Sequence, residues 1–169
     1  DQPLLAAKPA AGNVVETKTI PELGVTEWKL SNGIRVVMKP TDFKNDEVSF
    51  TAYSQGGTSL ASDADFIPAS TASAVIPLGG VAQFDQIALQ KMLTGKAAGV
   101  SPYINELQEG MNGSASPKDL ETMFQLIYLY ATQPRMDPKA FETFKASQRA
   151  SLQNRNARPE TAFQDTVTN

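Results

Sequence analysis

The stretch Leu30–Val37, LSNGIRVV, decides the fold because it predicts a β-hairpin early in the chain. Before it, Val25–Leu30 alternates apolar and polar residues, and Ile34–Met38 follows the central Ser31-Asn32-Gly33 as a second strand-like run. Asn-Gly between two such runs is the strongest short hairpin signal, since both residues tolerate the positive φ of a type I′ turn. We therefore expect two antiparallel strands joined by a tight turn.

Further strands follow the predicted hairpin. Glu47–Ser54, EVSFTAYS, has the composition of a strand with Val48, Phe50 and Ala52 on one face, and Gly56-Gly57 ends it. Lys96–Tyr103 and Leu107–Ala115 are two more strand candidates around a turn near Asn105-Glu106. The strands thus come in two blocks.

Helices are predicted between and after these blocks. Asp63 and Asp65 precede Phe66–Leu78, a run of small residues, and an Asp at this place is a good N-cap. Pro77 and Gly79-Gly80 stop that helix, and a short helix over Asp85–Leu93 follows and closes at Gly95.

The last third of the chain predicts three more helices. Ser116-Pro117-Lys118-Asp119 is a strong helix start, with Ser at the N-cap, Pro at the first position and an acid at the third. Asp137-Pro138 and Arg158-Pro159-Glu160 start two helices in the same way. The expected apolar positions on the three helices are Leu120, Met123, Phe124 and Ile127; Phe141, Phe144 and Leu152; and Phe163 and Val167.

Strands and helices in blocks favour an α+β fold, a two-layer sandwich with a largely antiparallel sheet and helices on one face. Residues 1–24, rich in Pro, Ala and Thr, are interpreted as a linker or N-terminal arm, with an ordered extension as the alternative. Residues 25–169 form the predicted domain. The abrupt ends at Asp1 and Asn169 lead us to expect a fragment, truncated at its C-terminus, of a longer polypeptide.

Composition excludes several function classes. A net charge of −3 and an isoelectric point near 5.0 give no basic footprint for nucleic acid. No apolar run approaches the roughly 18 residues of a membrane helix. The chain has no cysteine, which fits periplasm and cytoplasm equally, and it has no histidine.

Three segments together carry a family resemblance: LSNGIRVV at Leu30–Val37, SASPKDLETMFQL at Ser114–Leu126, and PRMDPKAFETF at Pro134–Phe144. In this order and spacing, over Val25 to about Leu152, the chain resembles the insulinase/pitrilysin-type zinc metallopeptidases, the M16 family. The resemblance implies tandem α+β domains, of which a catalytic one carries an inverted His-x-x-Glu-His zinc motif on its first helix.

The corresponding positions of this chain lack that chemistry. The two His positions fall on Ser70 and Ala74, the general-base Glu on Ser73, and the distal Glu ligand near Ser151. A catalytic zinc normally takes three protein ligands that include His or Cys, and no shift of register supplies a missing His. We therefore predict no catalytic, cofactor-binding or metal-binding residue in this chain.

The resemblance implies an inactive domain, the start of the second half of a longer zinc metalloendopeptidase. Such a domain helps to enclose a peptide or protein substrate and supports the catalytic domain of the same polypeptide, where the zinc is expected. The alternative is a structural or assembly domain, like the inactive core subunits related to this family. An unrelated α+β binding module is a third possibility. Kinship favours a periplasmic location, otherwise a cytoplasmic one.

Other residues have weaker functional interpretations beside plain structural ones. Asp63 and Asp65 suit a Ca²⁺ site less well than a helix cap. Gly79-Gly80 suggests a phosphate loop or a loop that guides substrate, and the simpler role is helix termination. Without histidine, a nucleophilic serine would need a lysine as base, and we expect no such dyad. The serines considered are Ser54, Ser59, Ser70 and Ser73.

Overall fold

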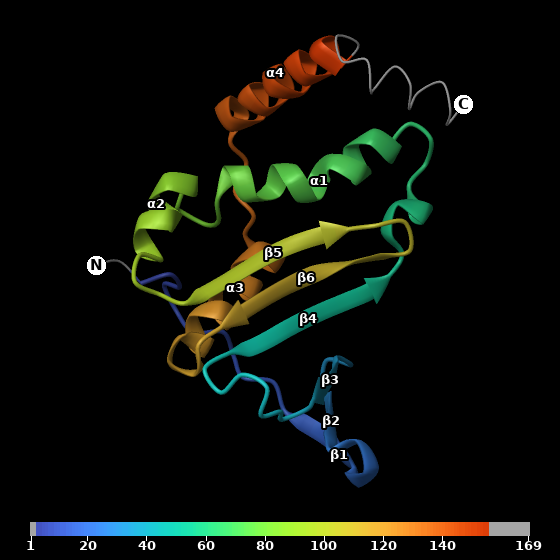
Figure 1. Cartoon of the computed structure of the whole chain (residues 1–169), viewed down its shortest axis with the longest axis vertical. Coiled ribbons are helices and arrows are strands. Elements are labelled where there is room, and N and C mark those ends of the chain that lie inside the picture. Colours follow the sequence, from blue (N-terminus) through green and yellow to red (C-terminus); the bar gives the residue numbers. More distant parts are fainter. Residues whose placement is uncertain (1–2, 156–169) are drawn as a thin grey trace. The chain divides into compact units, whose positions relative to one another are not determined.

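The structure is a computed structural model that describes residues 3–155 (Figure 1). The chain divides into two compact units, Asp1–Glu47 and Val48–Asn169. The helix expected from Arg158 to Val167 lies outside the described residues. The first unit holds a small sheet, and the second holds a larger sheet with its helices.

The first unit contains an antiparallel sheet of strands β1 (Val14–Ile20), β2 (Val25–Leu30) and β3 (Arg35–Met38), in that order. The hairpin of β2 and β3 confirms the prediction. Strand β1, however, lies within the segment interpreted as a linker. Its residues VVETKTI are mostly β-branched, and pairing along β2 gives them the strand partner that the sequence alone does not reveal.

The turn of the hairpin differs from the predicted type I′ turn. Only Gly33 has a positive φ, at 88°, so Asn32 does not adopt the left-handed conformation. The Gly33 N–H donates to the Leu30 carbonyl (2.9 Å), and the Asn32 side chain accepts a hydrogen bond from the Ile34 N–H (3.1 Å). This is the three-residue loop with a glycine bulge, in which Asn stabilises the turn through its side chain.

The second unit is built on strands β4 (Val48–Gln55), β5 (Ala98–Ile104) and β6 (Gln108–Ala115), which form an antiparallel sheet in the order β4-β6-β5. All three strands were predicted within a few residues. The register places Phe50 opposite Gly113, and Gly113 opposite Val100. These three residues therefore share one face of the sheet.

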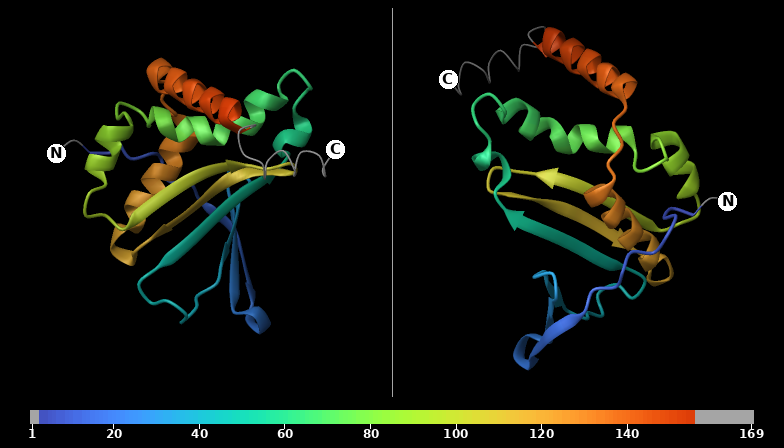
Figure 2. Two further views of the ribbon diagram at one scale, coloured as in Figure 1. Left: turned by 45° about the horizontal axis from the view of Figure 1, so that its top comes forward. Right: turned by 180° about the vertical axis from the view of Figure 1, so that it is seen from behind.

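Four helices complete this unit: α1 (Phe66–Gly79), α2 (Gln86–Met92), α3 (Leu120–Thr132) and α4 (Pro138–Arg155). Short 3₁₀ turns at Gly57–Leu60 and Pro117–Asp119 follow β4 and precede α3. Both α1 and α3 contact the sheet, and they lie on the same side of it (Figure 2). The predicted α+β class, with helices on one face of an antiparallel sheet, is confirmed.

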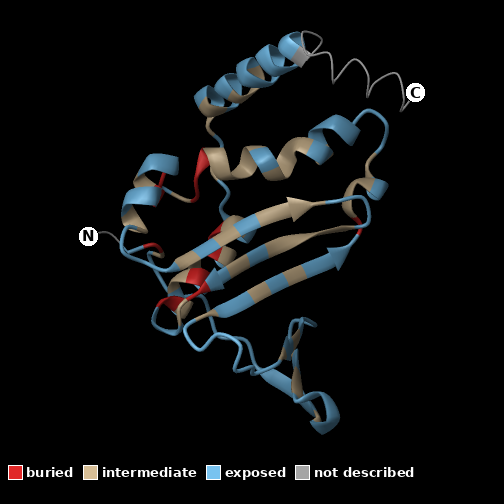
Figure 3. Cartoon of the chain, in the orientation of Figure 1, coloured by how far each residue is buried: buried red, intermediate tan, exposed pale blue. Residues whose placement is uncertain are grey.

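The core of the second unit lies where α2, α3 and the segment after α1 meet (Figure 3). On α3 the buried row is Met123, Leu126 and Leu129, each at most 2% exposed. The sequence predicted Leu120, Phe124 and Ile127 with Met123, and Phe124 is instead 51% exposed. The buried face of α3 is thus rotated relative to the predicted one. Which of two adjacent apolar positions is buried depends on the elements that pack against the helix.

Helix α4 begins as predicted: Asp137 accepts a hydrogen bond from the Ala140 N–H (3.0 Å). Its apolar side is less buried than predicted, since Phe141 is 43% and Leu152 is 62% exposed. None of the described helices is both long enough and apolar enough to span a membrane.

Candidate functional site on helices α1 and α4

Helix α1 carries three of the positions that correspond to the zinc motif. Ser70 and Ala74 are exposed and one helical turn apart, so they share a face, and Ser73 is half-buried beside them. The Ser70 hydroxyl donates to the Ile67 carbonyl within the same helix (3.1 Å). These side chains offer no imidazole and no carboxylate, the groups that the resemblance implies for zinc binding and water activation.

The fourth position, Ser151, is exposed on α4. Helices α1 and α4, which carry the four corresponding positions, contact each other (Figure 1). Among residues 3–155, no group of three or more His, Cys, Asp or Glu side chains is close enough to hold a metal ion. The predicted lack of a zinc site rests on the sequence and stays a prediction.

The acidic pair before α1 does not cap the helix as predicted. Asp65 is the N-cap residue, but its side chain caps no backbone N–H. Its carboxylate instead accepts a hydrogen bond from the Ser62 hydroxyl (2.7 Å) in the preceding turn. The helical backbone angles of Asp65, φ −99° and ψ −4°, differ from the extended conformation that an N-cap side chain needs. The hydrogen bond between Ser62 and Asp65 therefore lies within the turn before the helix.

Gly79-Gly80 forms a buried junction between distant segments. A Cβ on Gly79 would lie 1.9 Å from the Arg135 carbonyl oxygen, and one on Gly80 would lie 2.1 Å from the Phe84 carbonyl oxygen. The Gly80 carbonyl accepts from the Arg135 N–H (3.1 Å), and the Arg135 guanidinium donates to the Gly79 carbonyl (3.1 Å). Both glycines are buried, so this segment is a packing junction and is not an open phosphate-binding or substrate-guiding loop.

The candidate serines have structural partners. Ser54 donates to the Glu109 carboxylate (2.7 Å), and Ser59 donates to the Gly56 carbonyl (2.6 Å). With Ser70 bonded inside α1, none of these three donates its hydroxyl hydrogen bond to a lysine. The geometry gives no support to a Ser–Lys nucleophile at these positions.

Sequence reasoning missed the side chain that joins the start of β6 to the end of β4 and the turn after it. Glu109 accepts hydrogen bonds from the Ser54 hydroxyl and from the Gly57 N–H, and these two bonds lower the pKa of its carboxyl. A Cβ on Gly57 would lie 2.2 Å from the Asn105 carbonyl oxygen, which explains a glycine here. No local pattern signals this bond, because its partners are more than 50 residues apart.

Asp119 ties the start of α3 to the start of β5. The carboxylate is 3% exposed and accepts from the Ala97 N–H (2.9 Å) and from the Ser116 hydroxyl (2.8 Å). The Lys96 ammonium lies 3.6 Å away. The two hydrogen bonds, with the lysine charge, lower the pKa of Asp119 against the opposing effect of burial. Spacing predicted an acid at this helix start, but it did not predict the contact with β5.

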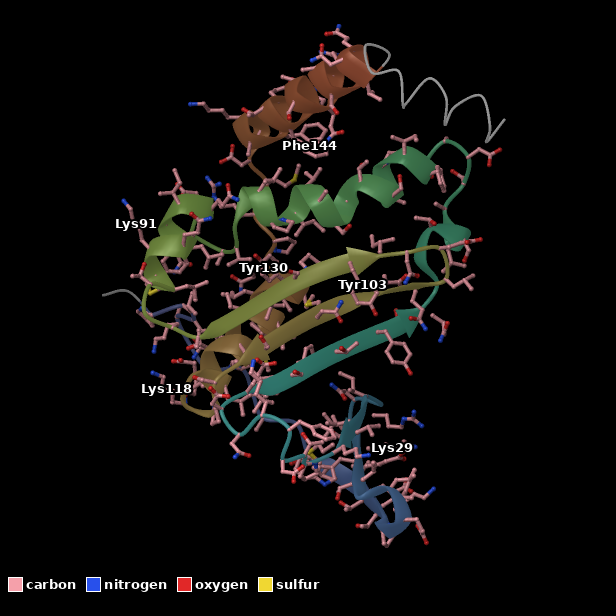
Figure 4. The ribbon with its side chains drawn as sticks, viewed as in Figure 1. Lys29, Lys91, Tyr103, Lys118, Tyr130 and Phe144 are labelled. Carbon is pink, nitrogen blue, oxygen red and sulfur yellow. The ribbon has the colours of Figure 1, made fainter. Side chains whose placement is uncertain are left out.

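A shallow depression of about 320 Å³ lies on the small sheet of the first unit. Glu16 lies opposite Lys29, and Lys18 lies opposite Glu27 in the strand register (Lys29 is labelled in Figure 4). Charges of opposite sign across neighbouring strands suit a solvated sheet face. The residues that line the depression are Glu16, Lys18, Glu27, Trp28, Lys29, Gly33 and Arg35.

Several aromatic side chains are partly exposed. Tyr53 is 58% exposed, and Trp28 and Tyr128 are each 37% exposed. Phe124 makes an edge-to-face contact with Phe50, with ring centroids 6.1 Å apart. Phe124 is thus held by a packing contact, whereas Tyr53 is an exposed aromatic on the sheet.

Comparison with known proteins relates the chain to named zinc proteases. No protein-family model matches the chain. The "Zinc protease PQQL-like" of Arabidopsis thaliana is 32% identical over 166 residues, which cover 97% of this chain and 15% of that protein. The "Probable zinc protease PqqL" of Haemophilus influenzae is 25% identical over 125 residues, 74% of this chain and 14% of that protein.

Two solved structures share the fold with a TM-score of 0.82. They are the ferredoxin protease FusC, solved as a mutant in complex with Arabidopsis ferredoxin, and the periplasmic protease PqqL from Escherichia coli. Each aligns with 98% of this chain and 18% of its own length, at 24% and 19% identity respectively. The chain is therefore a segment related to the M16 zinc proteases, as the sequence resemblance predicted, and it spans less than a fifth of the relatives it matches.

Proposed function

We propose that this chain forms a non-catalytic domain of an M16-type zinc protease. The domain helps to enclose a peptide or protein substrate and supports the catalytic half of the same polypeptide, which carries the zinc. One observation carries the proposal: α1 and α4 keep their places, while the four positions of the family's zinc chemistry hold Ser70, Ser73, Ala74 and Ser151.

The similarity to proteases sets the context of this role. The Arabidopsis and Haemophilus relatives are named zinc proteases, and FusC was solved with a protein bound. A domain without ligands of its own contributes to such an enzyme through binding and positioning, which lower the barrier without direct chemistry. The periplasmic location of PqqL in Escherichia coli makes the periplasm the proposed site of action.

The test compares the longer protein that contains this chain with a version from which the chain is deleted. Peptide hydrolysis and bound zinc are measured on both. We expect the deletion to lower hydrolysis while zinc stays bound, because the metal site lies elsewhere in the polypeptide. Circular dichroism of both proteins checks that the remaining domains stay folded.

A structural or assembly domain, the alternative, gives a different result. In that case the longer protein holds no zinc and hydrolyses no peptide, with or without the chain. Unchanged hydrolysis after deletion, in a protein that does bind zinc, would also contradict the proposed role.

A further inference from the structure

The chain contains two Asn-Gly steps, and the structure places them in different backbone settings. Asn32-Gly33 lies in the turn between β2 and β3, whereas Asn112-Gly113 lies in β6, the central strand of the larger sheet. Both asparagines are exposed, so exposure alone does not distinguish them. Asn-Gly is the step at which an asparagine most readily loses its side-chain amide, because glycine leaves the following main-chain nitrogen unhindered.

The turn folds the Asn32 side chain over the nitrogen of Gly33. The Ile34 N–H donates to Oδ1 of Asn32 (3.1 Å), which keeps the side chain directed forward along the chain, past Gly33. The same donor stabilises the negative charge that develops on Oδ1 when a nucleophile attacks Cγ. Gly33 has a φ of 88°, and a Cβ on it would meet no atom within 4 Å. A five-membered ring therefore has room to form at this step.

The strand keeps the Asn112 side chain away from the nitrogen of Gly113. Strand β6 pairs with both β4 and β5, so Asn112 lies opposite Thr51 on one side and Ser101 on the other. An extended backbone projects each side chain out of the strand, away from the nitrogen that follows it. A Cβ on Gly113 would lie 2.6 Å from the Gly99 carbonyl oxygen, so the neighbouring strand leaves no room for a ring. Ring closure here requires the sheet to open first.

We propose that Asn32 is a site of spontaneous deamidation in the folded protein, while the sheet protects Asn112. The Gly33 nitrogen forms a bond to Cγ of Asn32, the bond from Cγ to Nδ2 breaks, and ammonia leaves with the proton of the Gly33 N–H. Water then opens the cyclic imide at either carbonyl and gives aspartate or isoaspartate. Either product adds a negative charge to the turn, and isoaspartate lengthens its main chain by one carbon atom. The reaction consumes only water, so the inference is independent of the proposed function.

The test follows both steps in the longer protein that contains this chain. The protein is incubated in mildly alkaline buffer, digested at mildly acidic pH to stop the reaction, and mapped by mass spectrometry over time. We expect acid at position 32 to accumulate at least about tenfold faster than at position 112, since the strand has to open before the Asn112 ring can close. Isoaspartate should be among the products, because direct hydrolysis of the amide gives only aspartate.

The pH dependence gives a second readout at position 32. The Gly33 N–H donates to the Leu30 carbonyl (2.9 Å), and its nitrogen attacks only after the proton has left. The rate should therefore rise with pH. Asn32→Gln is the control variant, because its longer side chain closes a less favourable six-membered ring, and it is expected to abolish the product at position 32.

The same protein unfolded in urea shows whether the fold causes the difference. Both steps are Asn-Gly, so they should react at similar rates once neither is held by the structure. A tenfold difference that persists in urea would place the cause in the local sequence and overturn the proposal. Equal rates at the two positions in the folded protein, no product at position 32, or aspartate without isoaspartate would also overturn it.

Discussion

Asp119 shows how one side chain can join two distant segments of this domain. Its carboxylate accepts from the Ala97 N–H before β5 and from the Ser116 hydroxyl before α3, in a position that is almost fully buried. A buried carboxylate is tolerated only when its oxygens are hydrogen-bonded, and here both partners stabilise the ionised form. The pKa of Asp119 therefore lies below its usual value of 3.8.

Asp119→Asn is expected to lower the melting temperature at pH 7, because the amide accepts these bonds less strongly than a carboxylate. The stabilisation from a lowered carboxyl pKa is present above pH 3.8 and is lost as the pH falls through the folded-state pKa. The difference in melting temperature between wild type and variant should thus shrink below pH 3.8. Calorimetry across this range measures it.

Gly79→Ala tests the junction between α1 and the segment before α4. The added methyl would meet the Arg135 carbonyl oxygen at 1.9 Å, so a backbone segment has to move. We expect a loss of more than about 3 kcal/mol in the free energy of unfolding, measured with urea. Gly99→Ala is the control, because its Cβ would meet no atom within 4 Å. An equal loss from both variants would contradict the proposed clash.

At the scale of elements, local signals predicted most helices and strands but not their contacts. The Asp137 cap of α4 is present as predicted, with a bond of 3.0 Å to the Ala140 N–H. Asp85 caps α2 in the same way, with a bond of 2.7 Å to the Ala88 N–H, although the sequence analysis assigned it no cap. Strand β1 was missed because its signal depends on pairing with β2. Asp65 does not cap α1 because its backbone is helical, and its carboxylate accepts from Ser62 instead. The lack of a zinc site is a prediction from residue types, whereas the Gly79-Gly80 junction required the tertiary structure.

Helix α3 gives a prediction about its buried row. Met123→Ala removes a side chain that is 0% exposed and is expected to cost about 2–5 kcal/mol in the free energy of unfolding. Phe124→Ala removes a 51% exposed ring that contacts Phe50 edge-to-face. It should cost about 0.5–1.5 kcal/mol in the free energy of unfolding. Chemical denaturation of both variants checks the order. A larger cost at Phe124 would favour the face that the sequence predicted.

At the scale of the molecule, the boundary between the two units lies at the end of an exposed segment. Residues 39–46 are exposed and lie between β3 and β4, with an ion pair of Lys44 and Glu47 at its end. A pair in which one partner is largely exposed adds little stability. We therefore expect this segment to open more easily than either sheet.

Limited trypsin digestion is expected to cleave early after Lys44, where the chain is exposed and lies outside both sheets. Mass spectrometry of the products should find a fragment that begins at Asn45 and retains β4 to α4. Lys44→Gln removes the cleavage site and is expected to abolish this product. First cleavage inside the small sheet, after Lys18 or Lys29, or inside α2, after Lys91, would contradict the division into two units.

The Gly79-Gly80 junction also separates what holds the fold from what occupies the motif positions. Gly79 and Gly80 contribute main-chain atoms to the junction, while Ser70 and Ala74 are exposed on α1. Substitutions at these two exposed positions are therefore expected to leave the junction intact, so the scaffold and the side chains on its surface can change independently.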